Sequence, residues 1–351
     1  MIRILDITES SKWDEIVSSF AHYDVYYLSG YVRAFMINGD GMPQLLYYVD
    51  GQEEETASLR AIYVFMKRKT ALKNFFDCVT PYGYGGVLFE GDTSVENVQI
   101  FWEAYVAKMK AMNIVDNFVR YHPVLHNAES MRKISNVIDL GNTIAVDLSS
   151  PAVIWDNMIS KNRNMIRKAR KHGIIIGHGR GMELLEEFRG IYNTTMEHVH
   201  ASAYYFFGKP FYESIHQDLS NHYEVFYAMQ DGKIIAMSIM LFANNQMHYH
   251  LSGSLPECRY MAPTNLLLYE AALWGCQQGF KTLHLGGGVG SDKDSLYRFK
   301  ASFNRHSCCQ FSLGKEIFNQ EAYDELVALR TSADASFDKK SSFFPIYRYV
   351  K

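Results

Sequence analysis

K-T-L-H-L-G-G-G-V-G-S-D-K-D-S-L-Y-R-F-K-A-S-F, residues 281–303, is the most informative stretch of this sequence. The alternation over residues 282–285 predicts a short strand, and Gly286, Gly287 and Gly288 follow it directly. Glycine lets the backbone bend sharply and lets a ligand approach it closely. A short helix after the polar turn carries Tyr297 and Lys300. The pattern is compatible with a plain strand-to-helix turn and with a ligand-binding strand end beside a cation.

The composition indicates a folded globular protein. The 351 residues are enough for two domains, and 48% of them are hydrophobic while 21% are charged. A net charge of −3 gives no global signal for nucleic acid, so we expect no DNA partner, and RNA binding would need a local basic patch. The five cysteines form no metal-ligand spacing. No signal peptide or membrane span is recognisable, which favours a cytoplasmic protein with reduced thiols.

Strand and helix patterns alternate along the whole chain, which predicts an α/β fold with mixed sheets. From residue 174 on, the predicted order is strand, two helices, three strands, helix, strand, helix and strand. The first half follows a looser version of the same order. We therefore predict two similar domains, at residues 1–148 and 149–330, and an aromatic tail at residues 331–351 that docks back on a domain.

Two shorter stretches have local patterns of their own. Residues 25–28 have a short β-like pattern. Ser150, followed by Pro151, predicts a helix start, and Gly173 predicts its end, so one helix is expected over residues 150–172. Its second half is strongly basic. Cations favour a helix C-terminus, but this number exceeds what capping needs, so an anionic partner is an alternative. The basic residues are Lys161, Arg163, Arg167, Lys168, Arg170 and Lys171.

Several motifs, taken in order, resemble the FemAB-like branch of the GNAT acyltransferases, which includes relatives grouped with polysaccharide biosynthesis. The motifs are T-P-Y-G-Y-G-G (80–86), K-N-R-N-M-I-R-K-A-R-K-H-G (161–173), Y-Y-F-F (204–207), P-T-N-L-L-L-Y-E-A-A to L-H-L-G-G-G (263–288), Y-R-F-K-A-S-F (297–303) and F-F-P-I-Y-R (343–348). The resemblance implies two tandem GNAT-like domains, here without an inserted helical arm, and acyl transfer in a cleft.

The resemblance also implies where the acyl donor lies. It places the donor between the strands at 246–252 and 282–285, with its phosphates at the start of the next helix. Thr264, Asn265 and the three glycines Gly286, Gly287 and Gly288 are then the donor-binding candidates. The donor is acyl-CoA or aminoacyl-tRNA. Residues 259–265 read R-Y-M-A-P-T-N and lack the R/Q-x-x-G-x-G/A signature of CoA binding, which weakens acetyl-CoA without excluding it.

Catalytic candidates follow from the same resemblance. Lys300 matches the F-K dipeptide of the family, where a cation stabilises a developing oxyanion or holds a phosphate. Tyr297 is a candidate proton donor to the leaving group. Asp294, like Asp292, is a candidate base, although Asp294 is equally suited to cap a helix.

The remaining candidates concern the acceptor and a metal. Substrate-binding candidates are Tyr82, Tyr84, Tyr204, Tyr205, Lys161 and Arg163, with core packing as the alternative for the tyrosines. His248, His250 and His284 have no supporting carboxylate, so no metal site is predicted.

The sequence thus predicts an N-acyltransferase that acts on an amine of a cell-envelope glycan or a nucleotide-sugar acceptor. One alternative is a FemX-type ligase that uses aminoacyl-tRNA to build peptidoglycan bridges, with tRNA as a partner. The other is a non-catalytic binding module that has kept the fold.

Overall fold

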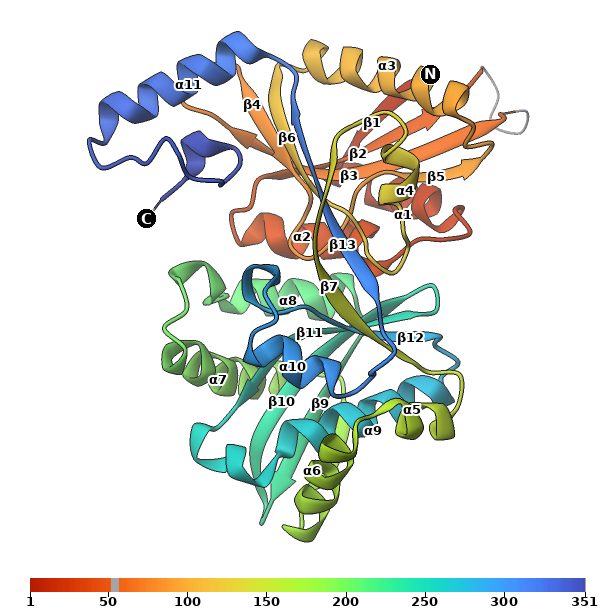
Figure 1. The fold of residues 1–351 in the computed structure, drawn as a ribbon, viewed down its shortest axis with the longest axis vertical. Helices are drawn as coiled ribbons and strands as arrows, with labels where there is room; N and C mark the ends of the chain where they lie inside the picture. Colours follow the sequence, from red (N-terminus) through yellow and green to blue (C-terminus); the bar gives the residue numbers. More distant parts are fainter. Residues whose placement is uncertain (52–56, 351) are drawn as a thin grey trace. The chain divides into compact units, whose positions relative to one another are not determined.

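The computed structural model describes residues 1–51 and 57–350, which form two compact units (Figure 1). Unit 1 comprises Met1–Leu140 and Phe311–Lys351, and unit 2 comprises Gly141–Gln310. These bounds differ from the predicted 1–148, 149–330 and 331–351. The reason is strand pairing, because β13 (Cys309–Ile317) pairs with β6 (Ile114–Arg120) and thereby returns the end of the chain to unit 1.

Unit 1 is built on a mixed sheet with strand order β1-β2-β3-β4-β6-β13, and β5 pairs with β3 at one side. Among the described strands of this unit, only β4 and β6 are parallel to each other. Parallel neighbours need a crossover connection, and α3 (Val95–Ala111) lies between them in sequence. The other strands are β1 (Ile2–Asp6), β2 (Met42–Val49), β3 (Leu59–Lys69), β4 (Phe76–Val79) and β5 (Leu88–Gly91).

Helices cover the sheet of unit 1 because each one buries an apolar stripe. In α3 the buried stripe is Val98, Phe101, Tyr105 and Met109, at helical spacing, and the last three pack with Tyr63 and other sheet residues in one core. The other helices are α1 (Ser10–Ser18), α2 (Ser29–Ile37), α4 (Ala128–Met131) and α11 (Gln320–Ala333), with short 3₁₀ turns η1 (Ile7–Glu9) and η7 (Ile346–Arg348).

The β-like prediction for residues 25–28 is wrong. Val25–Tyr27 forms the 3₁₀ turn η2, because Asp24 caps it and the Leu28 amide bonds back to the Val25 carbonyl at 3.1 Å.

The carboxyl-terminal tail packs on unit 1. The Tyr347 hydroxyl lies 2.9 Å from Asp77 Oδ2 on β4 and 2.5 Å from Asp116 Oδ2 on β6. The Phe344 ring stacks on Tyr323 of α11 with centroids 6.0 Å apart. The tail therefore forms part of this unit rather than a separate segment.

Unit 2 has the strand order β8-β9-β10-β11-β12-β7, which follows the same plan as unit 1. Its only parallel pair is β11 with β12, and α9 (Pro263–Gln277) forms the crossover between them. This mixed sheet, with helices on it, confirms the predicted α/β class. The strands are β7 (Val137–Asp147), β8 (Ile175–Gly179), β9 (Tyr223–Gln230), β10 (Lys233–Ala243), β11 (Gln246–Ser254) and β12 (Thr282–Gly286).

The helix predicted over residues 150–172 is two helices, α5 (Pro151–Asn157) and α6 (Ser160–Lys171). Met158 and Ile159 between them have extended backbones, with ψ of 146° and 151°. Arg163 Nη1 donates to the Met158 carbonyl at 2.7 Å, so the carbonyl that the break frees is satisfied. No glycine or proline marks this break in the sequence.

The remaining helices of unit 2 pack on its sheet. Between β8 and β9, α7 (Met182–His198) contacts β10, β11 and α8 (Lys209–Asp218), so no helical arm projects from this part of the described chain. The short elements are η4 (Ala203–Tyr205), η5 (Pro256–Met261), η6 (Val289–Ser291) and α10 (Ser295–Ala301). Among the described helices, none combines the length and the apolar character needed to cross a bilayer.

Candidate functional site

The two parallel strands of unit 2, β11 and β12, are paired over only part of their length. β11 and β12 pair only at Gln246↔Thr282, Met247↔Leu283 and His248↔His284. Beyond His248, β11 continues along β10 to Ser254, whereas the end of β12 pairs with β7. One edge of β11 is therefore released from the β12 ladder.

A β-bulge lies at this opening. Leu251 faces Ile239 and Tyr249 faces Met240, which leaves His250 as the extra residue of β11. A bulge takes a residue out of the ladder and redirects its side chain, and bulges are common beside active sites. Burial, with a smaller contribution from His248, lowers the pKa of His250 to about 3, so its imidazole is neutral at physiological pH.

His284 is fixed at the same place on the neighbouring strand. Its Nε2 lies 2.8 Å from Thr143 Oγ1, and its ring meets that of His248 edge-on at 5.6 Å. Both histidines are buried. Their environment is that of packed polar side chains, and the prediction of no metal in the protein stays a prediction.

The first turn of α9 offers backbone amides to an anion. Ala262 has a left-handed conformation (φ 62°) and, within the described residues, no side chain caps the helix. The amides of Thr264 and Asn265 belong to this turn, where the helix itself provides no acceptors. Asn265 Nδ2 donates to Oδ1 of buried Asn162 at 2.8 Å, and Asn162 Nδ2 donates to the Ser302 carbonyl at 3.4 Å. These contacts connect the start of α9 with the end of α10.

Lys300 is hydrogen-bonded to the glycine segment at the end of β12, residues 286–288. Its Nζ donates to the Gly287 carbonyl at 2.8 Å. Burial lowers the pKa of Lys300 to about 8, while the Asp294 carboxylate acts in the opposite direction. The side chain is therefore mostly an ammonium at neutral pH, but its proton is less firmly held than that of an exposed lysine.

Asp294 caps α10. Its Oδ1 accepts from the Tyr297 amide at 2.7 Å, and its Oδ2 accepts from the Val289 amide at 3.2 Å. These backbone bonds lower the pKa of Asp294, which makes its carboxylate a weaker base. A Cβ on Gly288 would lie less than 3.0 Å from the same carboxylate, so this loop requires a glycine there. The contacts favour the capping interpretation of Asp294 over the catalytic one.

The other predicted residues of unit 2 have different surroundings. Tyr297 packs against the core cluster of the unit. Lys161 is exposed, whereas Arg163 donates to the carbonyls that end α5 and thus has a structural partner. Tyr204 and Tyr205 are 41% and 36% exposed, so neither is a core residue.

In unit 1 the predicted Tyr82 and Tyr84 belong to an ordered loop. Tyr82 stacks on Phe35 with centroids 5.2 Å apart, and Tyr84 lies edge-on to Tyr26 at 5.9 Å. Arg120 holds the loop by donating to the carbonyls of Thr80 (2.9 Å), Pro81 (2.6 Å) and Gly83 (3.1 Å).

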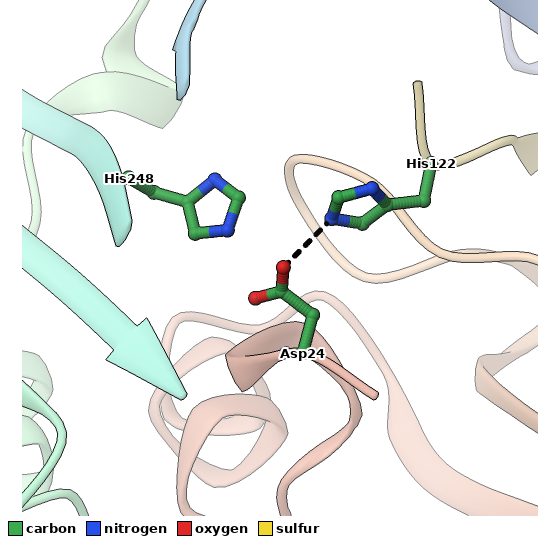
Figure 2. A group of neighbouring side chains, drawn as sticks. All are labelled: Asp24, His122 and His248. Carbon is green, nitrogen blue, oxygen red and sulfur yellow. Dashed lines mark ion pairs between the residues drawn. The ribbon is translucent and has the colours of Figure 1, made fainter. Parts of the chain in front are cut away.

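A buried acid–histidine pair lies next to Tyr84 of that loop and was not predicted. Figure 2 shows His122 and Asp24 facing each other, with His122 Nε2 3.0 Å from Asp24 Oδ2. His122 Nδ1 accepts from the amides of Val124 and Leu125, so the ring proton is at Nε2, toward Asp24. The two residues are far apart in sequence, and no local motif indicates their contact.

Comparison with known proteins agrees with this geometry. Residues 160–301, from α6 to the end of α10, match the family model described as an acetyltransferase (GNAT) domain. The structure of FemX matches with a TM-score of 0.69 and 14% identity, over 92% of this chain and 99% of that one. L-PGS from Bacillus licheniformis matches at 0.55 and 13%, over 92% and 96%.

A third solved structure has a tandem arrangement of GNAT domains. This protein, from the clavulanic acid biosynthesis pathway, matches with a TM-score of 0.50 and 8% identity, over 91% of this chain and 99% of that one. No curated protein matches the sequence. At these identities the structural matches show the fold.

Proposed function

We propose that the chain belongs to the FemAB-like branch of the GNAT acyltransferases and that unit 2 transfers an acyl or aminoacyl group to an amine of a cell-envelope glycan or nucleotide sugar. One observation carries the proposal. The parallel pair β11/β12 separates after His248 and His284, next to a bulge, and the glycine segment held by Lys300 follows β12 directly. The α9 amides complete a place for a phosphate-bearing donor.

In the proposed reaction Lys300 and Tyr297 have separate roles. The neutral acceptor amine attacks the carbonyl carbon of the donor, a new C–N bond forms, and the C–S or C–O bond to the leaving group breaks. The carbonyl oxygen becomes anionic during attack, and the Lys300 ammonium is the cation that stabilises it. Tyr297 protonates the leaving thiolate or alkoxide. The amine loses its proton to a base that we do not assign to Asp294, because Asp294 caps α10.

The donor is either acyl-CoA or an aminoacyl-tRNA, because both present phosphates to a helix N-terminus. The FemX-type alternative, an aminoacyl-tRNA-dependent ligase for peptidoglycan bridges, is favoured by one observation. The TM-score to FemX is 0.69 over 99% of that chain, against 0.50 for the tandem GNAT protein. The acceptor is then a peptidoglycan precursor rather than another envelope glycan.

The experiment that tests the proposal is a transfer assay with both donors. Acetyl-CoA or aminoacyl-tRNA is incubated with amine-bearing nucleotide sugars or peptidoglycan precursors, and the acceptor mass is measured. Lys300→Ala should lower kcat/KM by about 10²–10³-fold, because a preorganised oxyanion donor is lost. The matched control is Lys293→Ala, an exposed lysine of the same segment, which should stay within about threefold of wild type.

Two outcomes contradict parts of the proposal. Unchanged turnover of Lys300→Ala shows that the site assignment is wrong. If neither donor is transferred and neither raises the melting temperature, the non-catalytic binding module is the better explanation, because a bound donor stabilises the folded state.

A further inference from the structure

Unit 1 contains a cavity of about 910 Å³ that the transfer site does not use. Its floor is formed by β3, β4, β6 and β13, and its walls by α11 and the carboxyl-terminal tail. The volume is within the range of small-molecule sites, roughly 300–1,000 Å³. None of the residues that the sequence analysis proposed for catalysis or binding lines it.

The cavity is strongly basic, and none of its lining residues is acidic. The cations are Arg68, Lys69, Arg120, Lys315, Arg330 and Arg348. Few carboxylates balance them, because Asp77 serves both Arg68 Nε, at 2.7 Å, and Arg348.

Two further acids lie nearby, and one of them offsets a single cation. Asp334 pairs with Arg330 at 2.9 Å. Asp116 is weakened as a countercharge, because burial, with Asp77 beside it, raises its pKa to about 7. The cavity therefore keeps an excess of positive charge.

An apolar wall faces the same space. It consists of Leu326, Leu329 and Ala333 on α11, together with Phe343, Phe344 and Val350 of the tail. Several of these side chains are exposed, with Leu329 at 44%, Phe343 at 49% and Val350 at 77%. Exposed large apolar residues gathered beside cations are characteristic of a site for an amphipathic ligand.

We propose that this cavity binds an anionic amphiphile, namely a phosphate or diphosphate head group joined to an apolar chain. Arginine guanidinium groups match phosphate oxygens in geometry, and a head group with two or more negative charges matches several cations better than a carboxylate does. The apolar chain lies along α11 and the tail. The proposal does not rest on the transfer function, because all lining residues belong to unit 1.

Binding of three probes to the wild-type chain tests the proposal. Calorimetry compares dodecyl phosphate below its micelle concentration with inorganic pyrophosphate and with dodecyl maltoside. Dodecyl phosphate should bind saturably at one site, at least about tenfold more tightly than either other probe, and more weakly as salt increases. Equal affinity for pyrophosphate shows that the apolar wall is unused, and equal affinity for the maltoside shows that the cations are unused. Either result overturns the proposal.

Two variants locate the binding. The double variant Lys69→Glu with Lys315→Glu should weaken dodecyl phosphate binding by about tenfold or more, while Lys73→Glu, an exposed lysine outside the cavity, should not. Phe343→Ser should weaken dodecyl phosphate but not pyrophosphate, and Ile100→Ser, 56% exposed on α3, is its control.

Unchanged affinity in the double variant overturns the proposal. If the double variant does not fold, the Phe343→Ser variant still tests the proposal, because equal loss or no loss of dodecyl phosphate and pyrophosphate binding would overturn it. Acyl transfer should be unaffected in every folded variant, so failure here is distinguishable from failure of the proposed function.

Discussion

The two units share a strand plan but treat their parallel pairs differently. In unit 1, pairing of β4 with β6 is continued by the following loop, where the Thr80 amide bonds to the Phe118 carbonyl at 3.1 Å and the Gly85 amide to the Arg120 carbonyl at 2.8 Å. In unit 2, pairing of β11 with β12 ends at His248 and His284. The same plan thus yields a parallel pair that stays closed in one unit and a pair that opens in the other, and the donor site that we propose lies at the open pair.

The crossover helices α3 and α9 also differ, in how their N-termini are capped. Ser94 caps α3 by accepting from the Asn97 amide at 3.5 Å, whereas α9 begins after Ala262 with no side-chain cap in the described chain. Buried charges differ too. Unit 1 holds the buried carboxyl of Glu316, and unit 2 holds Lys300 beside a glycine segment. Glu316 thus lies in the core of unit 1, whereas Lys300 lies at the candidate site of unit 2.

Among the variants that compare the two units, the largest expected effect comes from adding one methyl group to the glycine segment of unit 2. In Gly288→Ala the new Cβ would lie less than 3.0 Å from the Asp292 carbonyl oxygen and the Asp294 carboxylate, so the loop that positions Lys300 must move. A displacement near 1 Å can cost about 10²-fold in rate, and kcat/KM should fall by that order.

Gly91→Ala is the matched control in unit 1. Its Cβ would meet the Ser58 carbonyl equally closely, at a φ of +101°. We expect a loss of about 1–3 kcal/mol in the free energy of unfolding, with kcat/KM of the folded protein retained. If the Gly91 variant loses turnover and the Gly288 variant keeps it, the assignment of transfer to unit 2 is wrong.

A smaller effect concerns the buried carboxyl of unit 1. Burial raises the pKa of Glu316 to about 7, although the Tyr105 hydroxyl (3.0 Å) and Asn117 Nδ2 (3.1 Å) donate to it. The folded state therefore binds this proton more tightly than the unfolded state does. Stability should fall as pH rises from about 4.5 to 7 and stay low above that range.

Glu316→Gln removes this titration and keeps an oxygen that accepts both bonds. The free energy of unfolding of unit 1 should rise by roughly 1–3 kcal/mol at pH 8 and change little at pH 4. Hydrogen exchange of the β6 and β13 amides measures unit 1 separately from unit 2. The exposed Glu325→Gln on α11 is the control. A variant that is equally stabilised at both pH values would show that proton binding is not the cause.

The sequence is most informative where the residues of a site lie close together along the chain. The glycine segment, the start of α9 and Lys300 all lie within residues 264–300, and periodicity with turn residues predicts their elements. The contacts that were missed join distant segments. Asp24 meets His122, Tyr347 meets Asp77 and Asp116, and β13 returns to β6. A single sequence contains no signal for such pairs, and the break at Met158 lacks the usual glycine or proline.

The smallest expected effect separates capping from catalysis at Asp294. In Asp294→Asn the amide oxygen still accepts from the Tyr297 amide, since asparagine caps helices as well as aspartate does, and only the longer bond from the Val289 amide is lost. Transfer at pH 7 should therefore fall by less than about threefold. A general base at this position requires instead a loss of roughly 10²-fold or more. Asp156→Asn, exposed on α5, is the control.

The pH profile of the same variant tests the role of Lys300. The Asp294 carboxylate counteracts the effect of burial, so its removal should lower the pKa of Lys300 below about 8. If Lys300 acts as a cation, activity is lost as pH rises through this pKa, and the alkaline limb of kcat/KM should move to lower pH in Asp294→Asn. An alkaline limb that stays in place would show that another group controls it. Transfer at the β11/β12 pair would then depend on a cation other than Lys300.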